Sequence, residues 1–276
     1  MSGFYWLASY PKSGNTWLRL LLQSCRDGGA AIDINAIAIG NTMALDRAAF
    51  DEEIGVASAD LSPGQILNWR GAAVRGIAAR ATAPLIEKTH VPCTRASGGD
   101  WLHPPDVTLG AVHLVRDPRD VAVSLARHLE RSIDDAIAMM ADPGLQLGVP
   151  AGKLPPRLVD FWSSWSVNAA SWLDAPFPVT TMRYEDLRAD PAAALAQMLP
   201  VLGMEAAPGV IASAVAATGL EALRAQEAAH GFREWPLAGG FFGRGEPGGW
   251  QNALSREQAG RIEQDHGQTM HRLGYR

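Results

Sequence analysis

The chain has 276 residues, a formal net charge of −5, and 47% hydrophobic against 19% charged residues. This composition is typical of a folded globular protein and argues against intrinsic disorder. Proteins that bind duplex nucleic acid usually have a basic face, and the sequence contains no run of lysine and arginine that would supply one. We therefore expect no nucleic-acid partner, and any anionic ligand must be bound by a few local cations.

Four short apolar segments predict β-strands. Each is followed by a polar turn and then by a helical pattern, an alternation that is typical of a parallel sheet with crossover helices. The predicted strands are residues 4–9, 85–88, 111–115 and 178–183. The expected fold class is therefore α/β, with a central parallel β-sheet flanked by helices.

Apolar residues at helical spacing predict helices between and after these strands. Two of the helices have clear start signals. Pro118 lies at a helix start, where a backbone N–H would have no partner within the helix, so a proline is tolerated. Ser255 precedes Gln258 by three residues, which is a capping-box pattern. The predicted helices are residues 16–25, 66–80, 118–131, 157–173, 191–202, 209–217, 220–229 and 255–273.

Three segments lack a clear period, and we expect them to be mobile segments around an acceptor site. They are residues 27–63, 142–156 and 230–249. The last contains seven glycines and two prolines, and long glycine-rich loops in a compact domain are usually functional. No linker divides the chain, so we expect residues 1–276 to form a single domain, which is within the size range of one large α/β domain.

The chain enters its first predicted strand almost at once, without a signal-peptide pattern. No apolar run reaches the roughly 18 residues that a membrane span requires. Two cysteines, Cys25 and Cys93, make neither a disulfide framework nor a zinc site, so we expect reduced thiols. Together these features predict a cytoplasmic protein.

The stretch "YPKSGNTW" lies where the first strand turns into a helix. Backbone N–H groups at a helix start are unpaired and carry the positive end of the helix dipole, so a loop that presents them is an anion site. Gly14 allows close backbone approach, Lys12 adds a charge, and Ser13, Asn15 and Thr16 add side-chain donors. The spacing differs from the nucleotide-triphosphate loop, in which a lysine follows the second glycine. The stretch predicts a phosphate cradle of another kind.

Five motifs in family order resemble those of sulfotransferases that use 3′-phosphoadenosine 5′-phosphosulfate (PAPS). "YPKSGNTW" resembles the 5′-phosphosulfate loop, "EKTHVP" the Lys-Thr-His segment, and "VRDPRDVAVS" the 3′-phosphate strand–loop–helix. "MRYEDL" resembles the Tyr-Glu-Asp element, and "GRGEPGGWQN" the C-terminal Arg-Lys-Gly loop. The motifs extend from residue 10 to residue 252, so the resemblance covers nearly the whole chain and implies a P-loop-like sulfotransferase fold.

The resemblance implies a role for individual residues in binding PAPS, or its product adenosine 3′,5′-bisphosphate (PAP). The residues expected to bind the donor are Lys12, Ser13, Gly14, Asn15, Thr16 and Trp17 at the 5′ end and base, Arg116, Ser124, Arg244 and Gly245 at the 3′-phosphate, and Tyr184, Thr218 and Leu220 near the adenine. The sequence departs from the family pattern at three positions and lacks the family's C-terminal dimerisation motif; one of the three is Gly249, where the family has an aspartate before the loop tryptophan. Gly243 replaces the first basic residue of the C-terminal loop, and Leu220 replaces a frequent phenylalanine.

The expected chemistry is an in-line displacement in which the protein supplies positioning and electrostatic stabilisation, by analogy with phosphoryl transfer. The resemblance implies that His90 removes the proton of the acceptor and that Lys88 helps to neutralise the sulfuryl group. Strand side chains alternate, so Lys88 and His90 are expected on the same side. Lys12 would stabilise the leaving phosphate oxygen, and no metal is expected.

The remaining histidines and three tryptophans are expected to lie in the core, at the surface or in loops, without a role in the reaction. His113 lies within "AVHLV" and is expected to pack inside a strand. The tryptophans at 162, 165 and 172 have helical spacing and predict a buried helix face. The histidines expected at the surface or in loops are His128, His230, His266 and His271.

The leading hypothesis is thus transfer of a sulfuryl group from PAPS to a hydroxyl of a small phenol or alcohol, with an aromatic or apolar acceptor. A P-loop nucleotide kinase with a variant cradle and a non-catalytic nucleotide-binding module are the alternatives. The kinase is disfavoured by the order of lysine and glycine. The sequence leaves the identity of the acceptor and the oligomeric state open, with a homodimer as one option.

Overall fold

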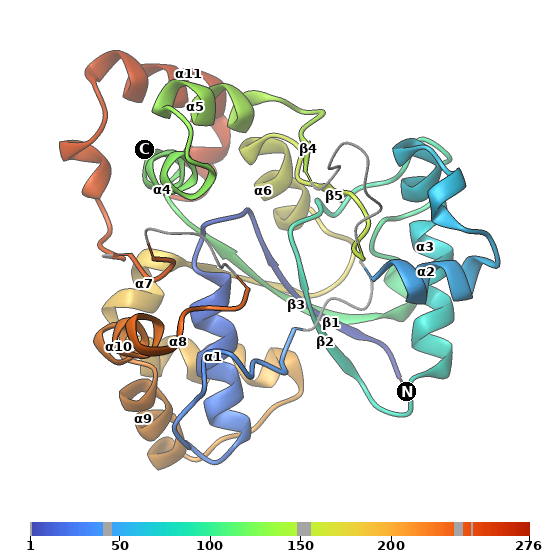
Figure 1. The fold of residues 1–276 in the computed structure, drawn as a ribbon, viewed down its shortest axis with the longest axis horizontal. Helices are drawn as coiled ribbons and strands as arrows, with labels where there is room; N and C mark the ends of the chain where they lie inside the picture. Colours follow the sequence, from blue (N-terminus) through green and yellow to red (C-terminus); the bar gives the residue numbers. More distant parts are fainter. Residues whose placement is uncertain (1, 41–45, 148–155, 235–239, 244) are drawn as a thin grey trace.

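The computed structural model describes residues 2–40, 46–147, 156–234, 240–243 and 245–276. Its centre is a four-stranded sheet in the order β2-β1-β3-β6, in which all neighbouring pairs are parallel (Figure 1). The strands are β1 (Phe4–Ser9), β2 (Leu85–Thr89), β3 (Thr108–Val115) and β6 (Val179–Arg183). All four predicted strands are therefore confirmed, and β3 begins three residues earlier than expected. The predicted α/β fold class is also confirmed.

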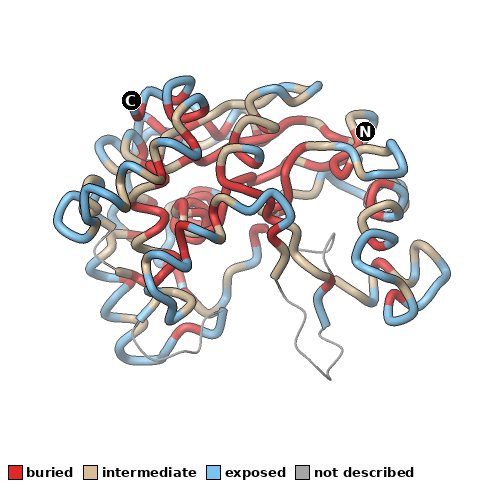
Figure 2. Tube along the Cα trace, turned by 90° about the horizontal axis from the view of Figure 1, so that it is seen from above, coloured by how far each residue is buried: buried red, intermediate tan, exposed pale blue. Residues whose placement is uncertain are grey.

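The sheet is buried on both sides, because its strands alternate between two apolar clusters. Leu7, Val112 and Leu114 belong to one cluster, and Phe4, Trp6 and Ala8 to another. Buried residues follow the strands and the first helix in Figure 2. Strands covered on both faces read as continuous apolar runs, and this explains the pattern "AVHLV".

Helices pack against both faces of the sheet and beyond its carboxyl end (Figure 1). The cluster around Leu7 contains side chains of α1 (Asn15–Arg26), α7 (Tyr184–Ala189), α8 (Pro191–Met198), α9 (Pro208–Ala217) and α10 (Leu220–His230). The cluster around Trp6 contains side chains of α3 (Pro63–Arg80) and α6 (Trp165–Leu173). A further cluster joins α4 (Pro118–Leu129), α5 (Ile133–Ala141) and α11 (Arg256–Arg272) to Tyr10 and Val115.

One predicted helix is wrong in its first half. Residues 157–164 precede the helix, and within them β5 (Asp160–Phe161) pairs antiparallel with β4 (Gln146–Leu147). Helix α6 begins only at Trp165, because the side chain of Ser164 accepts a hydrogen bond from Val167 N and caps it. The two consecutive serines before Trp165 were the sequence signal for this start.

The sequence also missed three short helices, which are α2 (Arg47–Ile54), α5 and α7. Helix α2 lies in segment 27–63, which had no clear period, and Asp46 caps it. Helix α5 has a capping box formed by Ser132 and Asp135. Short 3₁₀ turns occur at Ser58–Asp60, Pro105–Val107, Pro200–Leu202 and Gly249–Asn252. Within the described ranges, no helix combines the length and the apolar character needed to cross a membrane.

A buried hydrogen bond ties the start of β3 to β1 and offers a test of the sheet. Trp6 Nε1 donates to Thr108 Oγ1 at 3.1 Å, and Thr108 Oγ1 donates to the carbonyl of Pro104 at 2.8 Å. Replacement of Thr108 by valine keeps the shape but leaves a buried donor unpaired. We expect the free energy of unfolding to fall by about 1–3 kcal/mol in urea titrations.

The matched control is Thr180→Val on β6, where the residue is half-buried. Its hydroxyl makes no hydrogen bond to any described residue, so we expect a change within about 0.5 kcal/mol. Equal losses for the two variants would show that the hydrogen bond from Trp6 does not stabilise the sheet.

Candidate active site

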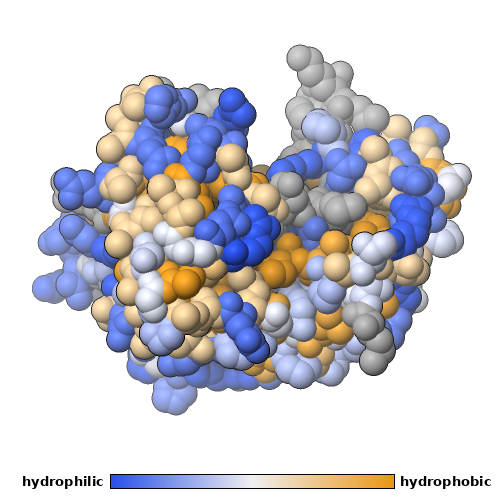
Figure 3. Space-filling view, turned by 90° about the horizontal axis from the view of Figure 1, so that it is seen from below, coloured by the Kyte–Doolittle hydropathy of each residue, from blue (hydrophilic) through white to orange (hydrophobic). Residues whose placement is uncertain are grey.

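The four parallel strands bring four predicted motifs to one edge of the sheet. Lys12 follows β1, His90 follows β2, Arg116 follows β3 and Tyr184 follows β6. Ligands of open α/β sheets bind outside the carboxyl ends of the strands. A cavity of about 590 Å³ lies there, and all four residues line it. The surface is hollowed between two lobes in Figure 3.

Most of the predicted site residues meet in this single cavity. Those that line it are Lys12, Gly14, Asn15, Thr16, Trp17, Lys88, His90, Arg116, Ser124, Tyr184, Leu220 and Gly245. Ser13 and Thr218 do not line it. Arg244 lies outside the described residues.

The loop after β1 presents the N-terminus of α1 to the cavity. Lys12 and Gly14 have positive φ angles of 68° and 99°, and Gly14 is the N-cap residue. Because glycine has no capping side chain, the first N–H groups of α1 stay available for an anion. The amide of Asn15 is already engaged, since Nδ2 donates to Leu7 O at 3.0 Å and to Ser9 Oγ at 3.1 Å. Asn15 thus holds the loop against β1.

Lys12 lies among other cations and aromatic residues. Its Nζ is 3.2 Å from His128 Nδ1 and 4.1 Å from the ring centre of Phe241. Burial, together with repulsion from Arg127, Lys88 and Arg116, lowers the pKa of Lys12 to about 7. Burial is the larger cause and the neighbouring cations add to it, so an anion in the cavity would raise the pKa of Lys12 again.

The ring of His90 has a defined tautomer. Its Nδ1 is 2.7 Å from the carbonyl oxygen of Ser9, which can only accept, so Nδ1 carries the proton and Nε2 has the lone pair. Asn168 Nδ2 donates to the backbone carbonyl of His90 at 2.7 Å and fixes its position. Burial and the charge of Lys88 hold the pKa of His90 well below its usual value. The imidazole is therefore neutral in the absence of ligand.

Lys88 also lies beside the cavity, at the end of β2. Burial, with repulsion from Arg19, lowers its pKa to about 8. Arg19 forms a two-pronged ion pair with Glu234, with both N–O distances at 2.9 Å. Asp160 lies on the same side, and burial raises the pKa of its carboxyl group. This half of the cavity therefore contains a neutral base and a cation beside two carboxylates.

Arg116 and Tyr184 connect the loop after β1 to the loop near the C-terminus. The guanidinium of Arg116 lies 4.5 Å above the ring of Tyr184, and Nη1 donates to Lys12 O at 3.3 Å. Its buried Nε has no hydrogen-bond partner within the described part of the chain. Tyr184 Oη donates to Gly245 O at 2.8 Å. A methyl group on Gly14 would lie 2.6 Å from the ring of Tyr184, so that contact requires glycine.

Two predicted site residues have other partners. The N–H of Ser13 donates to Tyr10 O at 3.3 Å, and its hydroxyl is fully buried. Thr218 is also fully buried, and its hydroxyl donates to Ala214 O at 2.8 Å. Its carbonyl accepts a hydrogen bond from Trp17 Nε1 at 3.0 Å. Thr218 therefore orients Trp17, which itself lines the cavity.

The sequence analysis missed several residues of the cavity. His128 was expected at the surface, but it lies beside Lys12, and burial lowers its pKa to about 3. Asp120, Ser124 and His128 are spaced four residues apart on α4, so helical periodicity could have found both neighbours of Ser124. Trp162 was assigned to a helix face, but it precedes α6 and its ring lies 6.4 Å from that of His90.

Other structural interpretations are confirmed in part. His113 is fully buried, and Trp165 and Trp172 lie in the core. His266 was expected at the surface, but it is buried and its Nδ1 is 3.0 Å from Ser166 Oγ. Cys25 and Cys93 are free, buried thiols. Among the described residues, no group of three or more metal-ligating side chains is arranged to hold an ion.

Comparisons with known proteins agree with this architecture. The family model described as "Sulfotransferase domain" matches residues 4–274. Cytosolic sulfotransferase 16 of Arabidopsis thaliana is 24% identical over 279 residues, covering 93% of this chain and 73% of that protein.

Two solved structures are similar in fold. Mouse sulfotransferase SULT7A1 complexed with PAP has a TM-score of 0.62 at 17% identity, covering 98% of this chain and 85% of that chain. Retinol dehydratase in a complex with retinol and PAP has a TM-score of 0.61 at 19% identity, covering 98% of this chain and 82% of that chain. The family match over nearly the whole length confirms the fold and the class of enzyme that the motifs predicted. The chain belongs to the sulfotransferase family.

Proposed function

We propose that this enzyme transfers a sulfuryl group from PAPS to a hydroxyl group of a small phenol or alcohol, with His90 as general base. One observation carries the proposal. The cradle after β1, the base after β2 and the cation after β3 line one cavity of about 590 Å³. A donor bound at the cradle would have its reactive end near His90, as an in-line displacement requires.

The described residues suit an anionic nucleotide with two charged ends. The N-terminus of α1, Lys12, Arg116 and Ser124 all line the cavity, and Arg116 Nη1 donates to Lys12 O at 3.3 Å. Arg116 Nε is buried without a partner among the described residues, and such a donor favours an additional acceptor in the cavity. Trp17, Tyr184 and Leu220 supply apolar surface for a base. PAPS supplies the activated sulfuryl group, and the two structures described above contain its product, PAP.

The residues of the chain then have separate tasks in the reaction. His90 Nε2, whose lone pair follows from the Nδ1 hydrogen bond to Ser9 O, accepts the proton of the acceptor hydroxyl. Lys12 stabilises the negative charge that develops on the leaving phosphate oxygen, and Lys88 lies beside the transferred group. The low pKa of His90 before binding reflects burial and the surrounding cations. A bound dianion would raise this pKa toward the pH at which the enzyme operates.

Aromatic side chains on the wall of the cavity suit an aromatic or apolar acceptor. Phe241, Phe242 and Trp162 line the cavity. Trp101 and Phe232 do not line it, and Trp235 lies outside the described residues. A solved relative contains retinol, and another structure of the same enzyme contains androsterone. We infer a small apolar alcohol or phenol as the acceptor.

The same proposal treats residues 1–276 as one domain that acts in the cytoplasm without a metal ion. The name of the plant relative supports the compartment. Segments 27–63, 142–156 and 230–249 are proposed to adjust around the acceptor. The described part of 230–249 supports this, because Glu234, Phe241 and Phe242 line the cavity.

A comparison of nucleotides tests the choice of donor. In thermal-shift measurements, PAP should raise the melting temperature more than ATP with magnesium or GTP, because a ligand that binds the folded state stabilises it. A larger shift with ATP and magnesium would favour a kinase. No shift with any of the three would favour a module without nucleotide turnover.

Removal of the base should separate binding from chemistry. In His90→Ala we expect PAP affinity within about twofold of the wild type, while kcat falls roughly 10²-fold or more, the range of general-base catalysis. Turnover is measured with labelled PAPS and the best acceptor from a screen of phenols and alcohols. His271→Ala on the exposed side of α11 is the control and should leave both quantities unchanged. Parallel losses of affinity and kcat in His90→Ala would contradict the assigned role.

The low pKa of Lys12 predicts a pH dependence of PAP binding. Without ligand this amine loses its proton near pH 7, whereas a bound phosphate raises its pKa. Binding above pH 7 therefore requires proton uptake, and the affinity should fall roughly fivefold between pH 7 and 8. Isothermal titration in buffers of different ionisation enthalpy measures both effects. In Lys12→Met the affinity should be lower and should fall less steeply over this interval, with Lys88, whose pKa is about 8, contributing the remaining slope. An unchanged slope would assign the titration to another group.

A further inference from the structure

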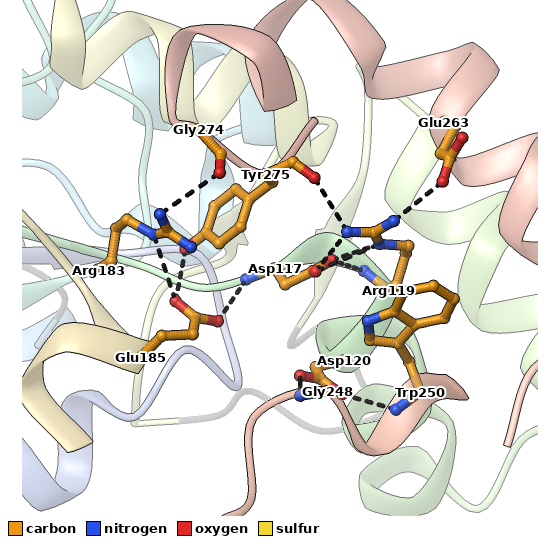
Figure 4. Close-up of polar contacts among 10 residues, drawn as sticks. All are labelled: Asp117, Arg119, Asp120, Arg183, Glu185, Gly248, Trp250, Glu263, Gly274 and Tyr275. Atoms are coloured by element: carbon orange, nitrogen blue, oxygen red, sulfur yellow. Dashed lines mark hydrogen bonds and ion pairs between the residues drawn. The ribbon is translucent and has the colours of Figure 1, made fainter. Parts of the chain in front are cut away.

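The loop that closes the donor half of the cavity is attached to two different helices. At its start, Glu227 of α10 accepts hydrogen bonds from the backbone N–H groups of Phe241 and Phe242, the second at 3.0 Å. At its end, the carboxylate of Asp120 on α4 accepts from Gly248 N at 2.7 Å and from Trp250 N at 2.9 Å (Figure 4). Between these attachments, Gly245 lines the cavity.

Asp120 occupies an unexpected place for a carboxylate. It is buried in the first turn of α4 and lines the same cavity as Arg116 and Ser124. A negative charge there repels an anionic ligand. Each of its oxygens, however, accepts one backbone N–H of the loop, Oδ2 from Gly248 and Oδ1 from Trp250. Charge-assisted hydrogen bonds of this kind are stronger than neutral ones, so Asp120 is well suited to fix the loop.

The neighbouring arginine supports the loop from a second side. The guanidinium of Arg119 lies 4.1 Å from the ring centre of Trp250. Arg119 is itself held by Asp117 at 2.7 Å, by Glu263 at 2.9 Å and by the carbonyl of Tyr275 at 3.0 Å (Figure 4). The base of the attachment is thus rigid.

This base extends to α7 through Glu185. Glu185 accepts the N–H of Asp117 at 3.1 Å and the hydroxyl of Tyr275 at 2.8 Å. The C-terminal residues and the first turn of α4 therefore form one network on the outer side of the loop (Figure 4).

We propose that Asp120 is a positioning residue that holds residues 245–250 closed over the donor nucleotide and thereby sets its affinity. This inference rests on the proposed function, because it takes PAP as the ligand of the cavity. Asp120 acts through the loop and donates nothing to the ligand. The gain in PAP affinity from the attached loop is larger than the loss from repulsion between the Asp120 carboxylate and the phosphates.

Asp120→Asn distinguishes this role from a purely electrostatic one, because the two roles predict opposite changes in the Kd for PAP. Neutralising a carboxylate beside an anion site would by itself tighten PAP binding. An asparagine, however, has one acceptor oxygen, and its amide N–H groups would face the second backbone donor. We expect the Kd for PAP to rise roughly tenfold, the KM for PAPS to rise with it, and kcat to change by less than about twofold.

The matched control for Asp120→Asn is Asp134→Asn on α5, which removes an exposed ion pair with Arg261. It should leave the Kd and the KM unchanged. An unchanged or lower Kd in Asp120→Asn overturns the proposal. A fall in kcat without a rise in KM also overturns it, because the side chain would then act on the reaction itself.

A second pair of variants perturbs the loop without touching a charge. Gly248 has a φ of 79°, and a methyl group added there would meet open space, so Gly248→Ala strains the backbone alone. Gly55, at the C-terminal end of α2, has a φ of 71° and similar space. Both alanine variants should lose similar stability, but only Gly248→Ala should weaken PAP binding, by roughly threefold or more. Equal PAP affinities in the two variants contradict the proposal.

Hydrogen exchange provides a readout that needs no ligand. In the nucleotide-free protein, the amides of residues 248 and 250 should exchange roughly tenfold faster in Asp120→Asn than in the wild type, and should be unaffected in Asp134→Asn. If the wild type fails to bind PAP while these amides still respond, the proposed donor is wrong and the attachment of the loop by Asp120 stands. If the amides exchange equally in all three proteins, the attachment is wrong whatever the nucleotide.

Discussion

The whole site depends on the parallel alignment of four strands. Ser9 pairs with Leu114 and Val115 pairs with Arg183, so the strands β1, β3 and β6 end at nearly the same level. The residues that follow each of these strands therefore lie around the same edge of the sheet. Four turns of different sequence thus contribute a lysine, a histidine, an arginine and a tyrosine to the same space. The apolar layers on both faces of the sheet keep this edge in place.

The charges of the cavity destabilise the protein when no anion is bound. Burial deprives Lys12 and Lys88 of water and lowers the pKa of both amines, and Lys12 is in addition repelled by Arg127, Lys88 and Arg116. The carboxylates nearby offset only part of this charge: Glu234 and Asp160 act on Lys88, but Glu234 is also paired with Arg19, and Asp120 is engaged with backbone N–H groups. The cations therefore favour a ligand with more than one negative group, and the engaged carboxylates shape the walls around it.

The sequence predicted those parts of the fold and site that depend on neighbouring residues. The strands, the cradle after β1 and the pair formed by Lys88 and His90 are local patterns. The start of α6 was missed because the capping side chain of Ser164 competed with a tryptophan spacing that looked helical. Some neighbours lie far away in the chain, and no local pattern encodes them: Trp17 for Thr218, Lys88 for Asp160 and His90 for Trp162. His128 was missed although it lies one helical turn beyond Ser124.

The hydrogen bond between His90 and the carbonyl of Ser9 has a consequence for selectivity under the proposed mechanism, in which His90 deprotonates a hydroxyl of the acceptor. An imidazole accepts a proton only along the in-plane direction of its free nitrogen, and here the backbone of β1 sets that plane. With His90 as the proposed base, an acceptor with several hydroxyls would be sulfated at the one that reaches this line while the rest of the molecule avoids Trp162. Regioselectivity would follow from main-chain geometry, which substitutions in the pocket wall do not readily alter.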